Sequence, residues 1–100
     1  MMAGLLPLTT HTLTAGTATG TTRTAAFAAG VSSITVTATE DCFIAFDSAT
    51  PTATVAASMF ITADWPYTFY VPPAVGAAGH KLAAITGTGA SSVYITELGN

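Results

Sequence analysis

The chain has 100 residues, of which only 7% are charged, and its net charge is −3. This length suits one domain, and a typical soluble domain carries about 25% charged residues. With Arg23 and Lys81 as the only fixed cations, the composition argues against direct binding to nucleic acid or to an anionic bilayer. So little charge favours association with other chains, because net charge keeps small domains apart in solution.

Residues 1–30 are rich in Thr, Ala and Gly. The amino end, MMAGLLPLTT, lacks a basic region and Pro7 breaks its apolar run, so we expect a soluble, unprocessed product without a signal peptide. Between Leu13 and Phe27 there is hardly a large side chain to offset about 1–2 kcal/mol of backbone entropy per ordered residue. We predict an extended N-terminal arm over residues 1–30, either mobile or laid against a neighbour as an edge strand.

Residues 31–46 predict two strands with a turn between them. In VSSITVTAT, residues 31–39, apolar residues alternate with serine and threonine, which is typical of a half-buried strand. CFIAF, residues 42–46, is a second alternating run. Glu40 and Asp41 separate the two runs, and a short polar break of this kind predicts a tight connection between antiparallel strands.

Short strands are predicted along the rest of the domain, which spans residues 31–100. The candidates are SMFIT (58–62), TFYV (68–71), KLAAIT (81–86) and SVYITEL (92–98). Between them lie stretches that carry turn-forming Gly, Pro or Asp, and DSATPTATVAA (47–57) is predicted as a loop or a weak edge strand. Strands this short, with no long amphipathic helix, predict an all-β fold: an antiparallel β-sandwich or a jelly-roll-like barrel.

The predicted core consists of medium-sized apolar side chains from these strands. They are Ile34, Val36, Ile44, Phe46, Met59, Ile61, Phe69, Val71, Leu82, Ile85, Val93 and Ile95. At about 25 cal/mol per Å² such a core is thin, so we expect oligomerisation to complete it.

Candidate interface residues are the large apolar side chains of the arm and the aromatic cluster at 65–70. They are Leu5, Leu6, Leu8, Leu13, Phe27, Trp65, Tyr67 and Tyr70. Aromatic side chains exposed at a turn are enriched at binding interfaces. The alternative for the aromatic cluster is that it caps one end of the fold.

Carboxylate and phosphate chemistry is not indicated. Glu40 and Asp41 are neighbours, so in extended chain their side chains point to opposite sides, whereas a glycosidase pair faces one sugar. TGTGAS at 86–91 lacks the lysine of a phosphate loop and predicts a hairpin loop.

Thiol and metal chemistry is not indicated either. Cys42 is predicted to be a buried small hydrophobe, since a nucleophile would need His11 or His80 held against it. No Cys-x-x-Cys or His-x-x-x-His spacing is present. We therefore expect a protein that is not an enzyme and holds no cofactor or metal; an enzyme would require a cleft that joins Cys42 to a histidine, or two acids.

Four stretches together resemble a group of small tailed-bacteriophage proteins: VTATEDCFIAF (36–46), PTATVAASM (51–59), a Tyr-Phe-Val-rich strand (67–71) and GHKLAAITGTGASSVYITEL (79–98). Those proteins typically read T-x-x-x-D-C-[FY]-I-A, then P-T-A, then G-x-K-[ILV]-A, then a Gly-rich turn and V-x-[IV]-T-E-L. The resemblance covers roughly residues 31–98 and excludes the Thr-rich arm. It implies a virion-associated β-sandwich of the capsid decoration or cement type, commonly a trimer over junctions between capsomers, with no catalytic residue.

We therefore expect a structural virion protein that binds the outside of a phage capsid and stabilises it. Its expected partners are the major capsid protein and further copies of itself, as a trimer, with residues 1–30 engaging the shell or an adjacent copy. It would be made in the host cytoplasm and located on the outer capsid surface. Two alternatives stay open: a head-fibre, neck or tail component, and a carbohydrate-binding module in which Trp65, Tyr67 and Tyr70 stack on sugar rings.

Overall fold

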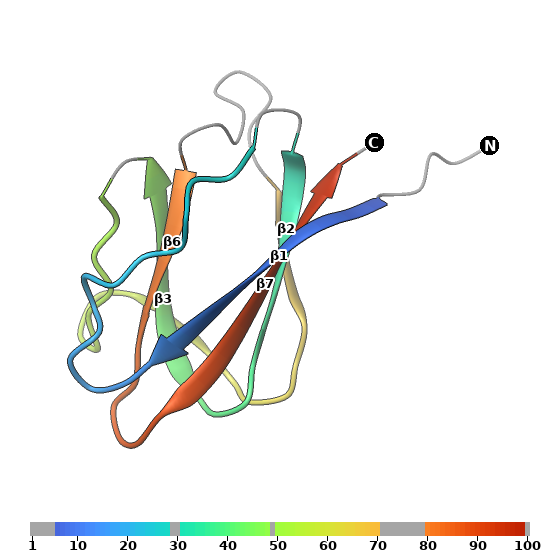
Figure 1. The fold of residues 1–100 in the computed structure, drawn as a ribbon. Helices are drawn as coiled ribbons and strands as arrows, with labels where there is room; N and C mark the ends of the chain where they lie inside the picture. The colour runs from blue at the N-terminus through green and yellow to red at the C-terminus, as the bar shows by residue number, and fades with distance from the viewer. Residues whose placement is uncertain (1–5, 29–30, 49, 71–79, 100) are drawn as a thin grey trace.

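The computed structural model describes residues 6–28, 31–48, 50–70 and 80–99, and this part of the chain contains strands and no helix. The strands are β1 (Leu6–Ala15), β2 (Val31–Ala38), β3 (Cys42–Ser48), β4 (Met59–Ile61), β5 (Tyr67–Tyr70), β6 (His80–Ile85) and β7 (Ser91–Gly99). They form two antiparallel sheets that lie face to face (Figure 1). Sheet A has the order β1-β7-β2-β5 and sheet B the order β4-β3-β6. The all-β class is therefore confirmed.

The predicted strands lie close to where the alternating patterns place them. The run predicted over 31–39 is β2, and the run predicted over 42–46 is β3, which extends to Ser48. β5 ends at Tyr70, and Val71, the last residue of its predicted run, lies outside the described residues. β1 lies in the predicted arm, for which an edge strand laid against a neighbour was one of two alternatives; it is an edge strand of the chain's own sheet A. In the described segments no helix is long and apolar enough to cross a membrane.

The core lies between the two sheets and takes side chains from both. Ile34 and Val36 of β2 are fully buried, as the alternation predicts. The other members of the core cluster are Leu13, Ala15, Phe27, Val31, Ala38, Cys42, Ile44, Ile61, Leu82, Ala84, Val93 and Ile95. Three predicted core residues are only partly buried, namely Phe46, Phe69 and Ile85. The prediction for Met59 is wrong, because this side chain is half exposed on the edge strand β4.

Two short connections that were predicted as hairpins pass from one sheet to the other. β2 and β3 lie in different sheets, and so do β6 and β7. The reason is burial: Ala38 at the end of β2 and Cys42 at the start of β3 both face the one core and are fully buried. The two connections also bind each other, since the Ser91 hydroxyl accepts from the N–H of Glu40 (3.1 Å) and donates to its carbonyl (3.0 Å). Gly89, with a φ of 73°, supplies the turn between β6 and β7.

Residues 6–15, which the sequence analysis assigns to an arm, form β1 at the edge of sheet A. β1 pairs with β7, where Leu13 lies opposite Val93 and Ala15 opposite Ser91. Leu13 and Ala15 point into the core, whereas the neighbouring Thr12 and Thr14 point outward and are exposed. The described part of the arm is thus integrated into the same fold as residues 31–99, because its alternate small apolar residues cover core side chains of β7.

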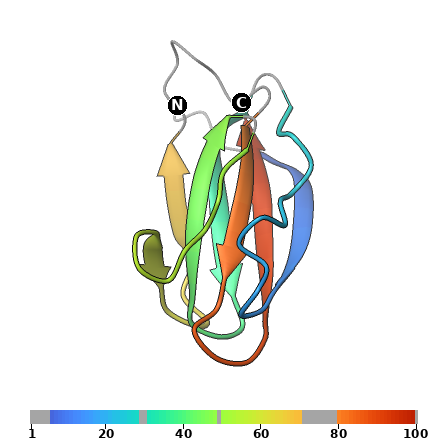
Figure 2. The ribbon, with the colours of Figure 1, turned by 90° about the vertical axis from the view of Figure 1, so that its left-hand side faces the viewer.

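Residues 16–28, named the closing segment here, run along the free edge of β6 (Figure 2). The N–H groups of Thr24 and Phe27 donate to the carbonyls of Leu82 (2.9 Å) and His80 (2.8 Å). The Leu82 N–H donates in return to the Thr24 hydroxyl at 3.0 Å. Phe27 is 2% exposed and fills the space between the two sheets at this edge. A segment with few large side chains is therefore ordered mainly through hydrogen bonds.

Threonines cover the outer face of sheet A. One row crosses all four strands, because Thr10 of β1 lies opposite Thr96, Thr96 opposite Thr35, and Thr35 opposite Thr68 of β5. Hydroxyls in this row are 3.0 Å apart in the first pair and 3.2 Å apart in the last. Such cross-strand pairs stabilise a sheet by a few tenths of a kcal/mol to about 1 kcal/mol each, which gives the threonine-rich composition a structural role.

Candidate interaction surface

The two lateral sides of the fold are built differently. β6 and β1 lie on one side, which the closing segment covers, and we call this the closed side. β4 and β5 are the edge strands on the other side (Figure 2). Among the described residues no segment pairs with the outer edge of either β4 or β5. We call residues 55–70, which comprise β4, β5 and their adjoining connections, the open side.

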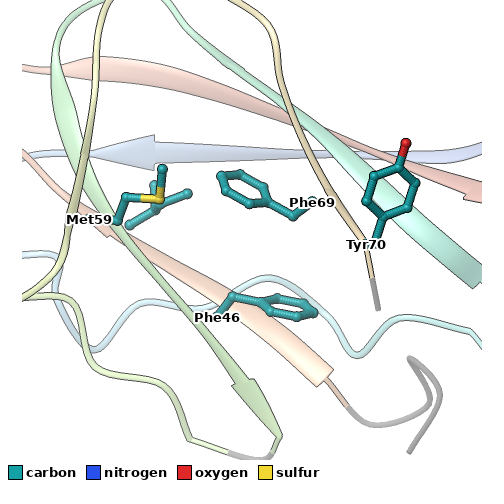
Figure 3. A pocket seen from close by; sticks show the side chains of 5 residues that line it. Phe46, Met59, Phe69 and Tyr70 are labelled. Carbon is teal, nitrogen blue, oxygen red and sulfur yellow. The ribbon is translucent and has the colours of Figure 1, made fainter. Parts of the chain in front are cut away.

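A hollow of about 250 Å³ opens between the sheets on this side. It is lined by Ile44 and Phe46 of β3, Met59 of β4, and Phe69 and Tyr70 of β5. Figure 3 shows Met59, Phe69 and Phe46 around the hollow, with Tyr70 at its rim. None of the five lining residues is charged. The hollow is smaller than typical small-molecule sites of roughly 300–1,000 Å³, and it suits a few apolar side chains from another chain.

Exposed apolar side chains are concentrated on the open side, and two of them, Met59 and Tyr70, line the hollow. The described residues include seven large apolar side chains that are exposed, and five of them belong to residues 55–70: Val55, Met59, Phe60, Trp65 and Tyr70. Tyr70 is 77% exposed and Trp65 is 64% exposed. The other two are Leu8 and Tyr94 of sheet A. Clusters of this kind mark interaction sites, whereas single exposed apolar residues are normal.

Tyr67 bridges the two edge strands at one end of the open side. Its phenolic oxygen accepts a hydrogen bond from the N–H of Thr62, which follows β4, at 3.1 Å. The hydroxyls of Thr62 and Tyr67 share a second hydrogen bond of 3.0 Å. These hydrogen bonds lower the pKa of Tyr67, because they stabilise its charged form. The ring also stacks on Phe69, with centroids 6.4 Å apart.

The turn that carries Trp65 is held in place by backbone contacts. The N–H of Ala63 donates to the Asp41 carboxylate at 2.7 Å, and the N–H of Asp64 donates to the carbonyl of Ala38 at 2.7 Å. Asp64 itself has a φ of 58°, a left-handed conformation that aspartate tolerates better than most residues. Asp41 is thus a turn residue that orders the neighbouring connection, and its carboxylate is committed to a backbone amide.

The predicted interface residues fall into three groups. Leu8, Trp65 and Tyr70 are exposed, and Tyr67 is half-buried. Leu13 and Phe27 are buried in the chain's own core, so these two are not surface positions. Leu5 and the side chain of Leu6 lie outside the described residues.

The three aromatic residues expected to stack on sugar rings do not form one platform. The ring of Tyr67 lies half-buried against Phe69, and its hydroxyl is bound to Thr62. Tyr70 points to the opposite face of β5 from Tyr67, as the period of two requires. Trp65 lies in the preceding turn, at the other end of β5 from Tyr70. Trp65 and Tyr70 therefore present separate exposed rings.

Cys42 and His80 lie at opposite ends of the β3–β6 ladder. Cys42 precedes the Phe43–Ile85 pair, while His80 lies opposite Ser48. Six residues of strand separate these ends by roughly 20 Å, so the two side chains form no dyad. The thiol is fully buried, as predicted. Burial, with a smaller contribution from the Asp41 carboxylate, raises the pKa of Cys42 to about 11, so the thiol stays protonated at neutral pH.

A buried carboxylate joins β7 to β1 and to the closing segment. Glu97 is 2% exposed, pairs with Nε2 of His11, and accepts a hydrogen bond from the N–H of Ala28 at 3.0 Å. The His11 ring lies 5.4 Å from the ring of Phe27. Sequence reasoning missed this contact, since 86 residues separate its partners and no local pattern relates them. Its position indicates a role in docking β1 and the closing segment.

Metal ligands are not grouped in the described segments, where no three His, Cys, Asp or Glu side chains lie close enough to hold an ion. Comparisons with known protein families, with curated proteins and with solved structures each found no match for this chain. A functional assignment therefore rests on the residues and their geometry, and the open side is where exposed apolar side chains are concentrated among the described residues.

Proposed function

We propose that this chain is a structural virion protein that binds the outside of a bacteriophage capsid and stabilises it, as a decoration or cement protein. The open side carries the proposal, because its apolar hollow and five exposed large side chains gain free energy when another protein chain covers them. The resemblance of residues 31–98 to phage proteins supplies the class of partner, the major capsid protein.

The two sheets are assigned as a β-sandwich. They share one apolar core, and no ladder joins them across either lateral side in the described parts of the chain, as closure into a barrel would require. We assign a homo-oligomer, a trimer on the shell, since a closed three-fold arrangement matches a local three-fold position between capsomers. Nucleic acid and membrane are not among the proposed partners, because the surface offers too few cations.

Heating of purified capsids with and without the protein tests the stabilising role. We expect bound protein to raise the temperature at which particles lose integrity. Tyr70→Lys, which puts a charge on the rim of the hollow, should reduce this gain because it weakens the homo-oligomer that binds the shell, whereas Tyr94→Lys on the outer face of sheet A should leave it intact. Unchanged capsid integrity with saturating wild-type protein would refute the proposal. Electron microscopy of labelled virions separates the outer shell from a head-fibre, neck or tail location.

A carbohydrate-binding role is the second candidate, and the exposure of Trp65 favours it. An exposed indole ring at a turn is suited to stacking on the apolar face of a sugar. Binding on a glycan array that Trp65→Ala abolishes and Tyr67→Phe retains would support this role. Absence of binding to any glycan would exclude it.

A further inference from the structure

The open side lacks two things that the closing segment provides on the closed side. One is backbone pairing, since β6 receives hydrogen bonds from Thr24 and Phe27 while the outer edges of β4 and β5 receive none from the described residues. The other is an apolar plug, since Phe27 fills the space between the sheets on one side and the hollow remains on the other. An unpaired edge beside uncovered core side chains is a site for another chain.

We infer that further copies of this chain cover the open side, so that this side is the contact surface of the homo-oligomer. The first reason is the chemistry of the lining. None of the residues that line the hollow is charged, so contact through the hollow brings no like charges together, although each chain carries a net charge of −3 and the open side includes the exposed Asp64 in the turn before β5. A partner selected by charge would find no counter-charge among these lining residues.

The second reason is shape. The open side carries a hollow together with exposed apolar side chains, because Met59 and Tyr70, which line the hollow, are 49% and 77% exposed. A surface that has both a hollow and exposed side chains can pair with the same surface of a second copy under closed symmetry, whether two-fold or three-fold. The outer edge of β5, which pairs with no other described segment, adds backbone groups that can pair across the contact.

The third reason is area. A stable interface takes roughly 800 Å² from each partner. This is about 15% of the chain's accessible surface of 5347 Å². Five of the seven exposed large apolar side chains among the described residues belong to the open side, so the apolar surface available for such an interface is concentrated there. No other described surface concentrates apolar side chains in this way.

The test measures stoichiometry in solution without capsids, by native mass spectrometry and sedimentation velocity. The inference rests on the self-association in the proposed function and not on the capsid, so its failure is separable from failure of the capsid assay. We expect wild-type protein to be oligomeric over roughly 1–100 µM, and Tyr70→Lys and Met59→Lys each to raise the dissociation constant about tenfold or more. The matched controls are Tyr94→Lys and Leu8→Lys, which place the same charge at exposed apolar positions of sheet A.

A wild-type monomer at the highest concentration would overturn the inference, and so would an oligomer that the controls disrupt as strongly as the open-side variants. Tyr70 is the safer of the two open-side positions, because a side chain that is 77% exposed contributes little to folding. Hydrogen exchange gives an independent readout. We expect amides of β5 to become more protected as protein concentration rises, while those of β1 do not change; equal behaviour of both edge strands would contradict the assignment.

Discussion

The closed and open sides of this protein differ in how the sheet edges and the apolar space between the sheets are covered. Each side exposes the edge of a sheet and the apolar space between two sheets. On the closed side residues 16–28 of the same chain pair with β6 and insert Phe27. On the open side Tyr67 bridges one end, and no described segment covers the hollow. The described part of the chain therefore covers one lateral side of the fold and not the other.

The chemistry of the two sides also differs. The closing segment is made of small residues and binds largely through hydrogen bonds, such as those of the Thr19 hydroxyl with Ala84 (2.7 Å) and of the Thr86 N–H with Gly16 (3.0 Å). The open side presents aromatic and aliphatic side chains. Backbone pairing suits permanent internal cover, because its geometry is set by the chain. Apolar surface suits a partner that arrives from outside, since burial is favourable without a fixed orientation.

The largest expected effect tests the internal plug. Phe27→Ala removes a buried ring that contacts the rings of His11 and Phe46. We expect unfolding by denaturant to show a loss of about 3–5 kcal/mol. Tyr70→Ala, which removes an aromatic ring from the open side, should change the stability of the monomer by no more than about 0.5 kcal/mol. Similar losses for the two variants would erase the distinction between the two sides.

The pH dependence of stability tests whether water is excluded from the core next to β4. Cys42 lies opposite Ile61 of β4, and both are fully buried. The pKa of its thiol rises from 9.0 to about 11 on folding, so the unfolded chain loses the proton first. Stability from this group is complete below pH 9 and falls between pH 9 and about 11, by up to about 2–3 kcal/mol. Cys42→Ala should remove this component of the alkaline loss; an unchanged loss in the variant would show that water reaches the thiol.

Gly20→Ala tests how closely the closing segment packs against the backbone of Ala53. A Cβ at this position would lie 2.2 Å from the backbone oxygen of Ala53, whose N–H donates to the Gly20 carbonyl. We expect a loss of about 1–3 kcal/mol in urea unfolding, because backbone rather than a flexible side chain must move. Gly87→Ala is the matched control, since nothing lies within 4 Å of its Cβ position. Equal tolerance at both glycines would mean that the contact between residues 20 and 53 is loose.

The smallest expected effect is that of salt on association through the open side. Because none of the residues that line the hollow is charged, there is little attraction for ions to screen. We expect the dissociation constant to change by less than about threefold between low and high salt, as measured by sedimentation. A steep weakening with salt would indicate a contact made through charged residues and not through the hollow.

The region most poorly predicted from sequence is residues 6–28. The run THTLTA in β1 does alternate, but His11, Leu13 and Ala15 present too little apolar surface for the pattern to stand out among threonines. The closing segment has no periodicity at all, because its order comes from hydrogen bonds to β6. The rim of the candidate surface was partly anticipated, since Trp65 and Tyr70 are exposed as expected. The hollow was not anticipated, because its lining residues Phe46, Met59 and Phe69 were predicted to be core positions.

The sequence by itself determined the all-β class, the positions of the strands after residue 30 and the burial of Cys42. These are local properties, since alternation along a strand records which face each side chain takes. Only the tertiary structure decided which strands pair, that the short connections cross between sheets, that Glu97 meets His11, and which side stays open. Those outcomes depend on contacts between residues far apart in the chain. No local sequence pattern indicates which distant segment will pair with a given strand or cover a given side of the core.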